Sequence, residues 1–157
     1  MEKTMTYNCE IKEQAAQPIL SRRTRLTMQE LPQFLGQTYG AVMQYLGELR
    51  EEPAGPPFAI YYNFDMNDLD IEAGFPVSKE YPAGYGLVSC EFPAGKMATC
   101  LHIGPYEQLK NAYDALSEWI KTRGYEPLGP TIEFYLNGPE TPPDKLQTLI
   151  AFPLKSN

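Results

Sequence analysis

The sequence predicts an α+β fold built from two tandem β-α-β-β units, with antiparallel sheets, helices on one side of them, pseudo-twofold symmetry and a central cleft. The first observation is a repeated order of segments. Residues 34–39, 55–63 and 75–77 resemble residues 102–107, 129–137 and 152–154 at offsets of 68, 74 and 77. The second observation is that each half has one amphipathic helical segment among short apolar segments, and helices on one face of a sheet define this class. The other sheet face, or the seam between the copies, is left for a ligand.

The first repeat, about residues 7–78, contains a helix predicted from about residue 31 to 51. Thr27 and Glu30 have the S/T-x-x-E spacing of a capping box, and apolar residues then recur at helical spacing. Pro53 and the prolines after it end this helix. The predicted strands of this half are residues 7–12, 19–27, 58–63 and 69–76.

The second repeat, about residues 84–154, contains the clearest predicted helix. It begins at Pro105 and ends near Arg123, and Gly124 provides its C-cap. One apolar stripe runs along it at helical spacing: Tyr106, Leu109, Tyr113, Leu116 and Ile120. The predicted strands of this half are residues 85–92, 96–103, 131–137 and 147–153. We therefore expect residues 1–157 to form a single domain of two similar repeats.

Composition restricts the class of protein and its partners. The 157 residues are 43% hydrophobic and 12% aromatic, which is typical of one globular domain. The net charge of −7 argues against direct binding of nucleic acid and favours cationic or neutral ligands. The three cysteines have neither disulfide nor metal-ligand spacing, so we expect reduced thiols in the cytoplasm, no metal and no cofactor. Neither a signal peptide nor a membrane span is expected, because no apolar run is long enough.

Strand alternation selects the candidate site residues. Within residues 131–137 every second side chain is apolar, so Glu133 and Tyr135 lie on the opposite face. The repeat is interpreted to place Tyr61 and Asn63 at the equivalent positions of the first half. A carboxylate among tyrosine rings suits a cationic or polarised aromatic ligand, because ring faces attract positive charge and the carboxylate neutralises it. The common alternative is a glutamate on the solvated face of the sheet, since glutamate is rarely buried.

An ordered set of short segments extends from about Tyr7 to Leu154. Its members are residues 59–65, 74–77, 93–96, 102–106, 119–120, 124–125 and 129–137. Together they resemble the GyrI-like small-molecule-binding family, which includes effector-binding domains of multidrug-responsive transcription activators and stand-alone gyrase-inhibitory proteins. The resemblance implies a tandem of two β-α-β-β units and a central ligand cleft with a glutamate at its floor, for which Glu133 is the matching residue. It also implies aromatic cleft residues at Tyr61, Tyr106 and Trp119.

Several other residues have two interpretations. His102, the only histidine, is either a structural histidine bonded to the backbone near the helix start or an acid or base at the edge of the cleft. Tyr113 and Trp119 fit packing in the helix core better than stacking on a ligand. The basic cluster of Arg22, Arg23 and Arg25 is interpreted as a solvated strand face, with a minor anion contact as the alternative.

Three functions are compatible with these residues. The first is a stand-alone multidrug-binding protein that holds amphipathic aromatic or cationic compounds in a cleft with an acidic floor. The second, implied by the resemblance, is a hydrolase of cyclopropane-type electrophilic genotoxins, in which Glu133 acts on water or the electrophile and Tyr106 assists; this needs a raised pKa at Glu133. The third is a protein-interaction module that modulates a topoisomerase through an acidic patch, with Glu48, Glu51 and Glu52 as candidates.

Overall fold

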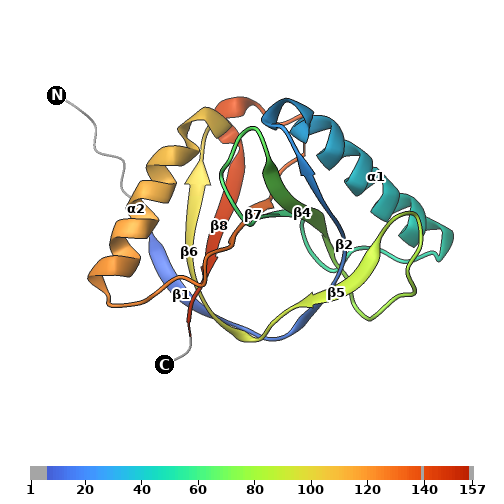
Figure 1. The fold of residues 1–157 in the computed structure, drawn as a ribbon, viewed down its shortest axis with the longest axis horizontal. Coiled ribbons are helices and arrows are strands. Elements are labelled where there is room, and N and C mark those ends of the chain that lie inside the picture. Colours follow the sequence, from blue (N-terminus) through green and yellow to red (C-terminus); the bar gives the residue numbers. More distant parts are fainter. Residues whose placement is uncertain (1–6, 139, 156–157) are drawn as a thin grey trace. The chain divides into compact units, whose positions relative to one another are not determined.

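The computed structural model describes residues 7–138 and 140–155 and divides the chain into two compact units. The middle unit is Gln14–Ala94, and the terminal unit combines Met1–Glu13 with Gly95–Asn157. In each unit antiparallel strands form a sheet that packs against one long helix (Figure 1). The predicted α+β class is therefore confirmed.

The middle unit has four strands in the order β3-β4-β2-β5. Its elements are β2 (Gln17–Leu26), α1 (Leu31–Glu48), β3 (Phe58–Tyr61), β4 (Leu69–Pro76) and β5 (Val88–Phe92). The helix begins after the predicted capping box, in which the Thr27 backbone N–H donates to Glu30 Oε1 at 2.8 Å. It ends at Glu48, earlier than predicted, and Arg50 adopts a left-handed φ of 56°. Three buried side chains of α1, those of Val42, Tyr45 and Leu46, belong to one hydrophobic cluster with Leu20 of β2 and Phe75 of β4.

The terminal unit has four strands in the order β1-β6-β8-β7. Its elements are β1 (Cys9–Gln14), β6 (Gly95–Ile103), α2 (Leu109–Thr122), β7 (Thr131–Tyr135) and β8 (Gln147–Pro153). A short 3-10 turn over Tyr106–Gln108 precedes α2, so the regular helix begins later than predicted. The C-cap residue of α2 is Arg123, and Gly124, which was predicted for that role, follows it at φ 79°; the Tyr125 N–H donates to the Ile120 carbonyl at 3.1 Å.

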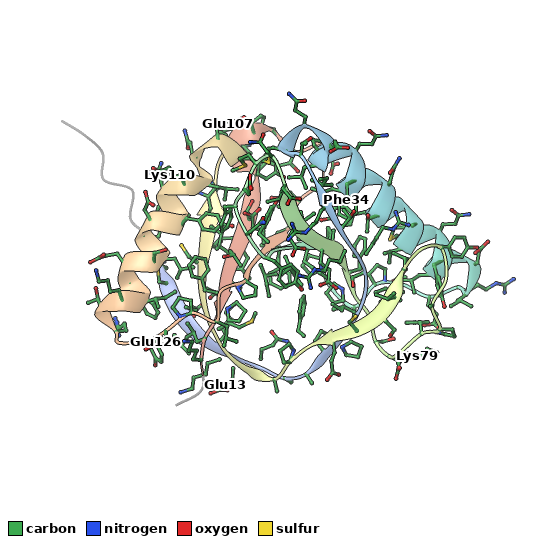
Figure 2. All side chains as sticks on the ribbon, viewed as in Figure 1. Glu13, Phe34, Lys79, Glu107, Lys110 and Glu126 are labelled. Atoms are coloured by element: carbon green, nitrogen blue, oxygen red, sulfur yellow. The ribbon has the colours of Figure 1, made fainter. Side chains whose placement is uncertain are left out.

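The outer and inner sides of α2 differ as its amphipathic pattern predicts. Ala112, Leu116 and Ile120 are buried against the sheet of the terminal unit. Glu107 and Lys110 belong to the outer side near the helix start (Figure 2), where Lys110 pairs with Asp114 at 3.2 Å. An exposed pair of this kind contributes little to stability.

The two units share one order of elements. The segment β2-α1-β3-β4 and the segment β6-α2-β7-β8 each form a strand, a helix and two strands, and the third strand of each lies between the other two in its sheet. The buried helix positions Thr38, Val42 and Leu46 match Ala112, Leu116 and Ile120 at an offset of 74. The offset of 68 between the starts of the helical segments stays a prediction.

The strand register gives a second way to match Glu133 with a residue of the middle unit. If Phe75 is matched to Phe152, then Ala73 is matched to Ile150. Ala73 stands opposite Ala59 on β3, and Ile150 stands opposite Glu133 on β7. This match makes Ala59 the counterpart of Glu133 and Tyr61 the counterpart of Tyr135. On this match Tyr61 lies two residues from the counterpart of Glu133, and a shift of two keeps the same face of a strand.

The edge strands do not follow the sequence order of the repeats. β1 lies at the start of the predicted first repeat but pairs with β6 in the terminal unit, and β5 lies at the start of the predicted second repeat but pairs with β2 in the middle unit. Alternation along a strand predicts its faces but not its partner, so the sequence pattern could not reveal this.

Two further findings concern the described residues alone. None of the helices in residues 7–138 and 140–155 is long and apolar enough to cross a membrane. The same part of the chain holds no group of three or more His, Cys, Asp or Glu side chains that could bind a metal ion.

Candidate functional site

A buried carboxyl group, that of Glu133, is the centre of the candidate site. Glu133 lies on β7 and is only 6% exposed, which excludes the alternative of a solvated surface glutamate. It stands opposite Ile150, whose side chain packs under α2, so Glu133 lies on the helix-covered face of its sheet. The expectation that the other sheet face serves the site therefore does not hold for Glu133.

Tyrosine hydroxyls provide the hydrogen bonds to this carboxyl. Tyr113 of α2 donates to Oε2, and Tyr135 of β7 donates to Oε1 at 2.8 Å. The ring of Tyr106 meets that of Tyr135 edge to face, with centroids 6.1 Å apart. We call Glu133, Tyr106, Tyr113 and Tyr135 the acid–tyrosine cluster.

The sequence predicts Tyr113 in the helix core and gives no prediction of its hydrogen bond to Glu133. The helical stripe contained a usable indication, because Tyr106 and Tyr113 are seven residues apart and therefore share one side of the helix. Side chains on that side meet the sheet, where Glu133 lies. The middle unit has Tyr39 at the position equivalent to Tyr113, and its hydroxyl donates to the Phe58 carbonyl at 2.9 Å. A backbone acceptor there takes the place of the carboxylate.

Burial controls the protonation of the cluster. Burial raises the pKa of Glu133, because removal from water disfavours the charged form, and the bonds from Tyr113 and Tyr135 oppose this to a smaller extent. The pKa of Tyr106 is also raised, first by burial and then by the nearby negative charge of Glu133. The cluster therefore holds a carboxyl group that binds a proton more readily than an ordinary glutamate.

The Tyr113→Phe variant tests the hydrogen bond to Glu133. We expect the pKa of Glu133 to rise further, because the lost hydroxyl stabilised only the ionised carboxylate. The measurement is a carbon-13 NMR titration of the Glu133 carboxyl. Tyr39→Phe is the matched control and should leave this titration unchanged, since Tyr39 bonds to a backbone carbonyl instead. An unchanged titration in Tyr113→Phe would contradict the assigned bond.

His102 has the structural arrangement that one of its two interpretations predicted. It is fully buried, its Nε2–H donates to the Pro105 carbonyl at 3.1 Å, and its Nδ1 accepts from the Tyr7 hydroxyl at 3.2 Å. A carbonyl can only accept, so Nε2 carries the proton. His102 therefore fixes the turn that leads into Tyr106.

Trp119 packs beside the α2 core as the sequence predicted. It contacts the buried cluster of the terminal unit, and the Arg123 guanidinium lies 4.8 Å from its ring centroid. A role for Trp119 in binding a ligand stays a prediction.

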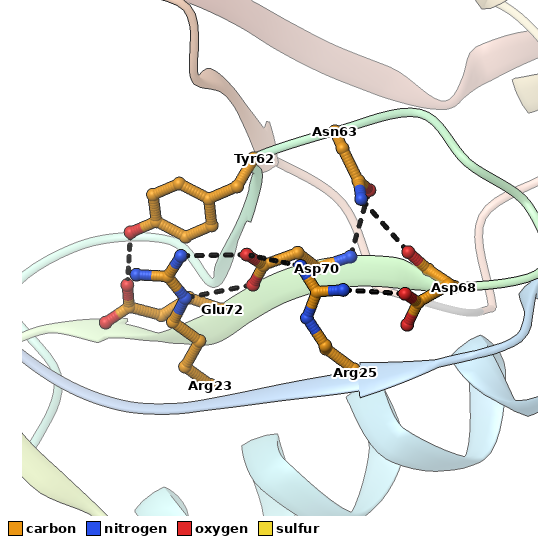
Figure 3. A network of polar contacts seen from close by, with 7 residues as sticks. All are labelled: Arg23, Arg25, Tyr62, Asn63, Asp68, Asp70 and Glu72. Atoms are coloured by element: carbon orange, nitrogen blue, oxygen red, sulfur yellow. Dashed lines mark hydrogen bonds and ion pairs between the residues drawn. The ribbon is translucent and has the colours of Figure 1, made fainter.

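Tyr61 and Asn63 belong to the middle unit, so their predicted share in a site with Glu133 stays a prediction. Tyr61 is buried and stacks on Phe64, with centroids 5.9 Å apart. The Asn63 side chain braces the turn between β3 and β4: its Nδ2 donates to the Asp68 carbonyl at 3.0 Å, and its Oδ1 accepts from the Asp70 N–H at 2.9 Å (Figure 3).

A second buried carboxyl, that of Glu72 in β4, was not predicted. It is 7% exposed and accepts hydrogen bonds from the hydroxyls of Ser21 and Tyr62, both at 2.5 Å. The Arg23 guanidinium lies 3.6 Å from the centroid of the Tyr62 ring and binds both oxygens of Asp70 at 2.9 Å (Figure 3). Glu72 thus belongs to a network that already contains a cation.

The surroundings of the other predicted charged residues are also defined. Arg25 pairs with Asp68 at 2.6 Å and Arg23 pairs with Asp70 at 2.9 Å, whereas Arg22 donates to the Tyr85 carbonyl at 2.7 Å. Glu48 accepts from the Tyr85 hydroxyl, and Glu51 accepts from the Tyr81 hydroxyl and pairs with Lys79. Two of the three residues proposed for an acidic docking patch are therefore engaged within the middle unit.

Comparison with known proteins covers nearly the whole chain. A model of the GyrI-like small molecule binding domain matches residues 7–155. No curated protein sequence matches. The C-terminal domain of EcmrR superposes with a TM-score of 0.76 and 23% identity over 98% of this chain and 100% of that domain. In the EcmrR–DNA complex the TM-score is 0.76 and the identity 22% over 96% of this chain, which spans 58% of the EcmrR chain.

Two more solved structures share the fold at lower identity. A hydrolase from Listeria innocua matches with a TM-score of 0.67 and 14% identity, over 94% of this chain and 91% of that one. SAV2435 bound to tetraphenylphosphonium matches with a TM-score of 0.65 and 14% identity, over 96% of this chain and 94% of that one. At these identities the likeness establishes the fold and no more.

Proposed function

Because this chain belongs to the GyrI-like small-molecule-binding family, we propose that its acid–tyrosine cluster binds an amphipathic aromatic cation, with the positive charge held by Glu133. The supporting observation is a buried carboxyl that accepts hydrogen bonds from the phenol hydroxyls of Tyr113 and Tyr135. Within residues 7–138 and 140–155, none of the ion pairs involves Glu133.

The contrast between the two buried carboxyls supports this proposal. Glu72 lies in a network with Arg23, whereas Glu133 lies among tyrosines. A buried carboxylate without a cation costs several kcal/mol, and a ligand that supplies the cation recovers part of that cost. Tyrosine faces add cation–π attraction of about 0.5–2 kcal/mol. SAV2435, a relative by fold, binds such a cation, tetraphenylphosphonium.

A charged and a neutral probe of similar shape test the proposal. We expect tetraphenylphosphonium to bind at least about tenfold more tightly than neutral triphenylphosphine oxide at pH 8, because only the cation meets the Glu133 charge. Isothermal titration calorimetry measures both affinities. Equal affinities would overturn the proposed role of the charge.

The same titration should depend on pH in a defined direction. Burial raises the pKa of Glu133, so the free carboxyl takes up a proton at a higher pH than an ordinary glutamate. Affinity for the cation should fall as the pH is lowered through this raised pKa and should level off above it. Binding near that pH should release a proton, which calorimetry in buffers of different ionisation enthalpy detects. The neutral probe should show neither effect.

Hydrolysis of an electrophile is a second candidate function for the same residues. It is supported by the raised pKa of Glu133 and by tyrosine hydroxyls within hydrogen-bonding distance of it, the arrangement that general acid–base chemistry needs. The hydrolase from Listeria innocua shares the fold. Release of a hydrolysed product from a cyclopropane-bearing electrophile, followed by mass spectrometry, would favour this function. The topoisomerase-modulating role stays a prediction.

A further inference from the structure

Two of the three cysteines form a cross-strand pair in the terminal unit. β1 neighbours β6 in the sheet, the Tyr7 hydroxyl bonds to His102, and the Thr99 hydroxyl bonds to the Glu10 carbonyl. In an antiparallel pair of strands the numbers of facing residues have a constant sum, and both contacts give a sum of 109. The numbers of Cys9 and Cys100 give the same sum, so these two residues stand directly opposite each other.

The side chains of this pair point to the same face. Cys9 and Cys100 both pack against the hydrophobic cluster under α2, and the two thiols share a hydrogen bond. Directly opposite residues on one face have Cβ atoms about 4.5–5.5 Å apart, somewhat wider than the 3.5–4.5 Å that a disulfide spans. A small movement of the edge strand β1 closes that gap.

We propose that Cys9 and Cys100 are a thiol–disulfide site that forms a covalent bond between β1 and β6 when the protein meets a low-molecular-weight disulfide. This proposal is independent of what the acid–tyrosine cluster binds. The sequence spacing of the cysteines concealed the pair, because about 90 residues separate them.

Exposure determines the order of the chemical steps. Cys9 is partly exposed and Cys100 is buried, so an oxidant reaches Cys9 first. The Cys9 thiolate attacks the disulfide reagent, forms a mixed disulfide and releases one thiolate of the reagent. The Cys100 sulfur, after losing its proton to solvent, attacks the Cys9 sulfur and releases the second. Two protein thiols are thereby oxidised, and one reagent disulfide is reduced to two thiols.

The second step should be the slow one. Burial, together with the neighbouring Cys9, raises the pKa of Cys100 to about 12, and burial also raises the pKa of Cys9. Since the thiolate is the nucleophile, ring closure should accelerate as the pH rises. Once formed, the bond joins residues far apart in the sequence and restricts the unfolded chain, which raises stability.

The test uses the Cys90→Ser variant, which removes the exposed third cysteine and leaves the pair. After exposure to oxidised glutathione at pH 8.5, we expect a mass loss of two hydrogens and a tryptic peptide pair joined through Cys9 and Cys100. We expect the Tm to rise by about 5–10 °C and to return to its starting value with a reductant.

The matched control is Cys9→Ser combined with Cys90→Ser, which should show neither the mass loss nor the shift in Tm. Circular dichroism establishes that this variant is folded. The proposal would be overturned if both thiols of Cys90→Ser could still be alkylated in denaturant after exposure to oxidised glutathione. Stable glutathione adducts on both cysteines would also overturn it.

Discussion

Replacing Glu133 with glutamine is expected to weaken binding of tetraphenylphosphonium by about 2–3 kcal/mol, which is roughly 30- to 150-fold. Glutamine keeps the shape of the side chain. Its amide oxygen can accept the hydrogen bond from one of Tyr113 and Tyr135, and its NH2 group can donate to the hydroxyl oxygen of the other, so the change removes mainly the charge. The loss should be large because the carboxyl is buried, where water screens its attraction to a cation only weakly. Calorimetric titration of the variant measures the loss.

The neutral probe separates a lost charge from a damaged site. Triphenylphosphine oxide should bind Glu133→Gln within about threefold of the original affinity, since it makes no ion pair. The pH dependence of cation binding should also disappear in this variant. Equal losses for both probes would contradict the assigned role of Glu133, and thermal unfolding of the variant checks that the fold is intact.

The second large effect is expected at Gly74, where alanine should destabilise the protein by about 3 kcal/mol or more and lower the Tm by about 6–12 °C. A Cβ atom there would lie 1.9 Å from the Leu20 carbonyl oxygen and 2.8 Å from the Ser21 Cα. Both contacts are with backbone of the neighbouring strand β2, which cannot rotate away. The strand pair must therefore separate locally, and chemical denaturation measures the cost.

Gly40→Ala is the matched control for this substitution. Gly40 lies inside α1 with open space around its hypothetical Cβ, so the same added methyl group should stabilise the protein by about 0.5–1 kcal/mol. Opposite signs for the two substitutions are the expected result. A Gly74→Ala variant as stable as the original protein would contradict the close approach of β2 and β4.

Much of the local structure was predictable because it depends on residues close together in the sequence. The helical stripe of α2 predicted its buried side at Leu116 and Ile120, and Gly124 marked its end. Alternation placed Glu133 and Tyr135 on one face of β7, and both contribute to the acid–tyrosine cluster. The resemblance along the chain led to the correct family.

Other features were beyond prediction because they depend on which segments meet. The burial of Glu133 follows from its position opposite Ile150 under α2, and its second hydrogen bond comes from Tyr113, twenty residues earlier. The carboxyl of Glu72 is buried by partners on β2 and after β3, which no local pattern connects to it.

The sequence alone therefore determined the α+β class, the two helices, the faces of the strands and the acid on which the proposed function depends. The tertiary structure alone decided which strand pairs with which, which tyrosines bond to that acid and that Cys9 meets Cys100. The physical reason is that periodicity and capping arise from neighbouring residues along the chain. Burial, the pKa values that it shifts and cross-strand contacts arise from residues that only folding brings together.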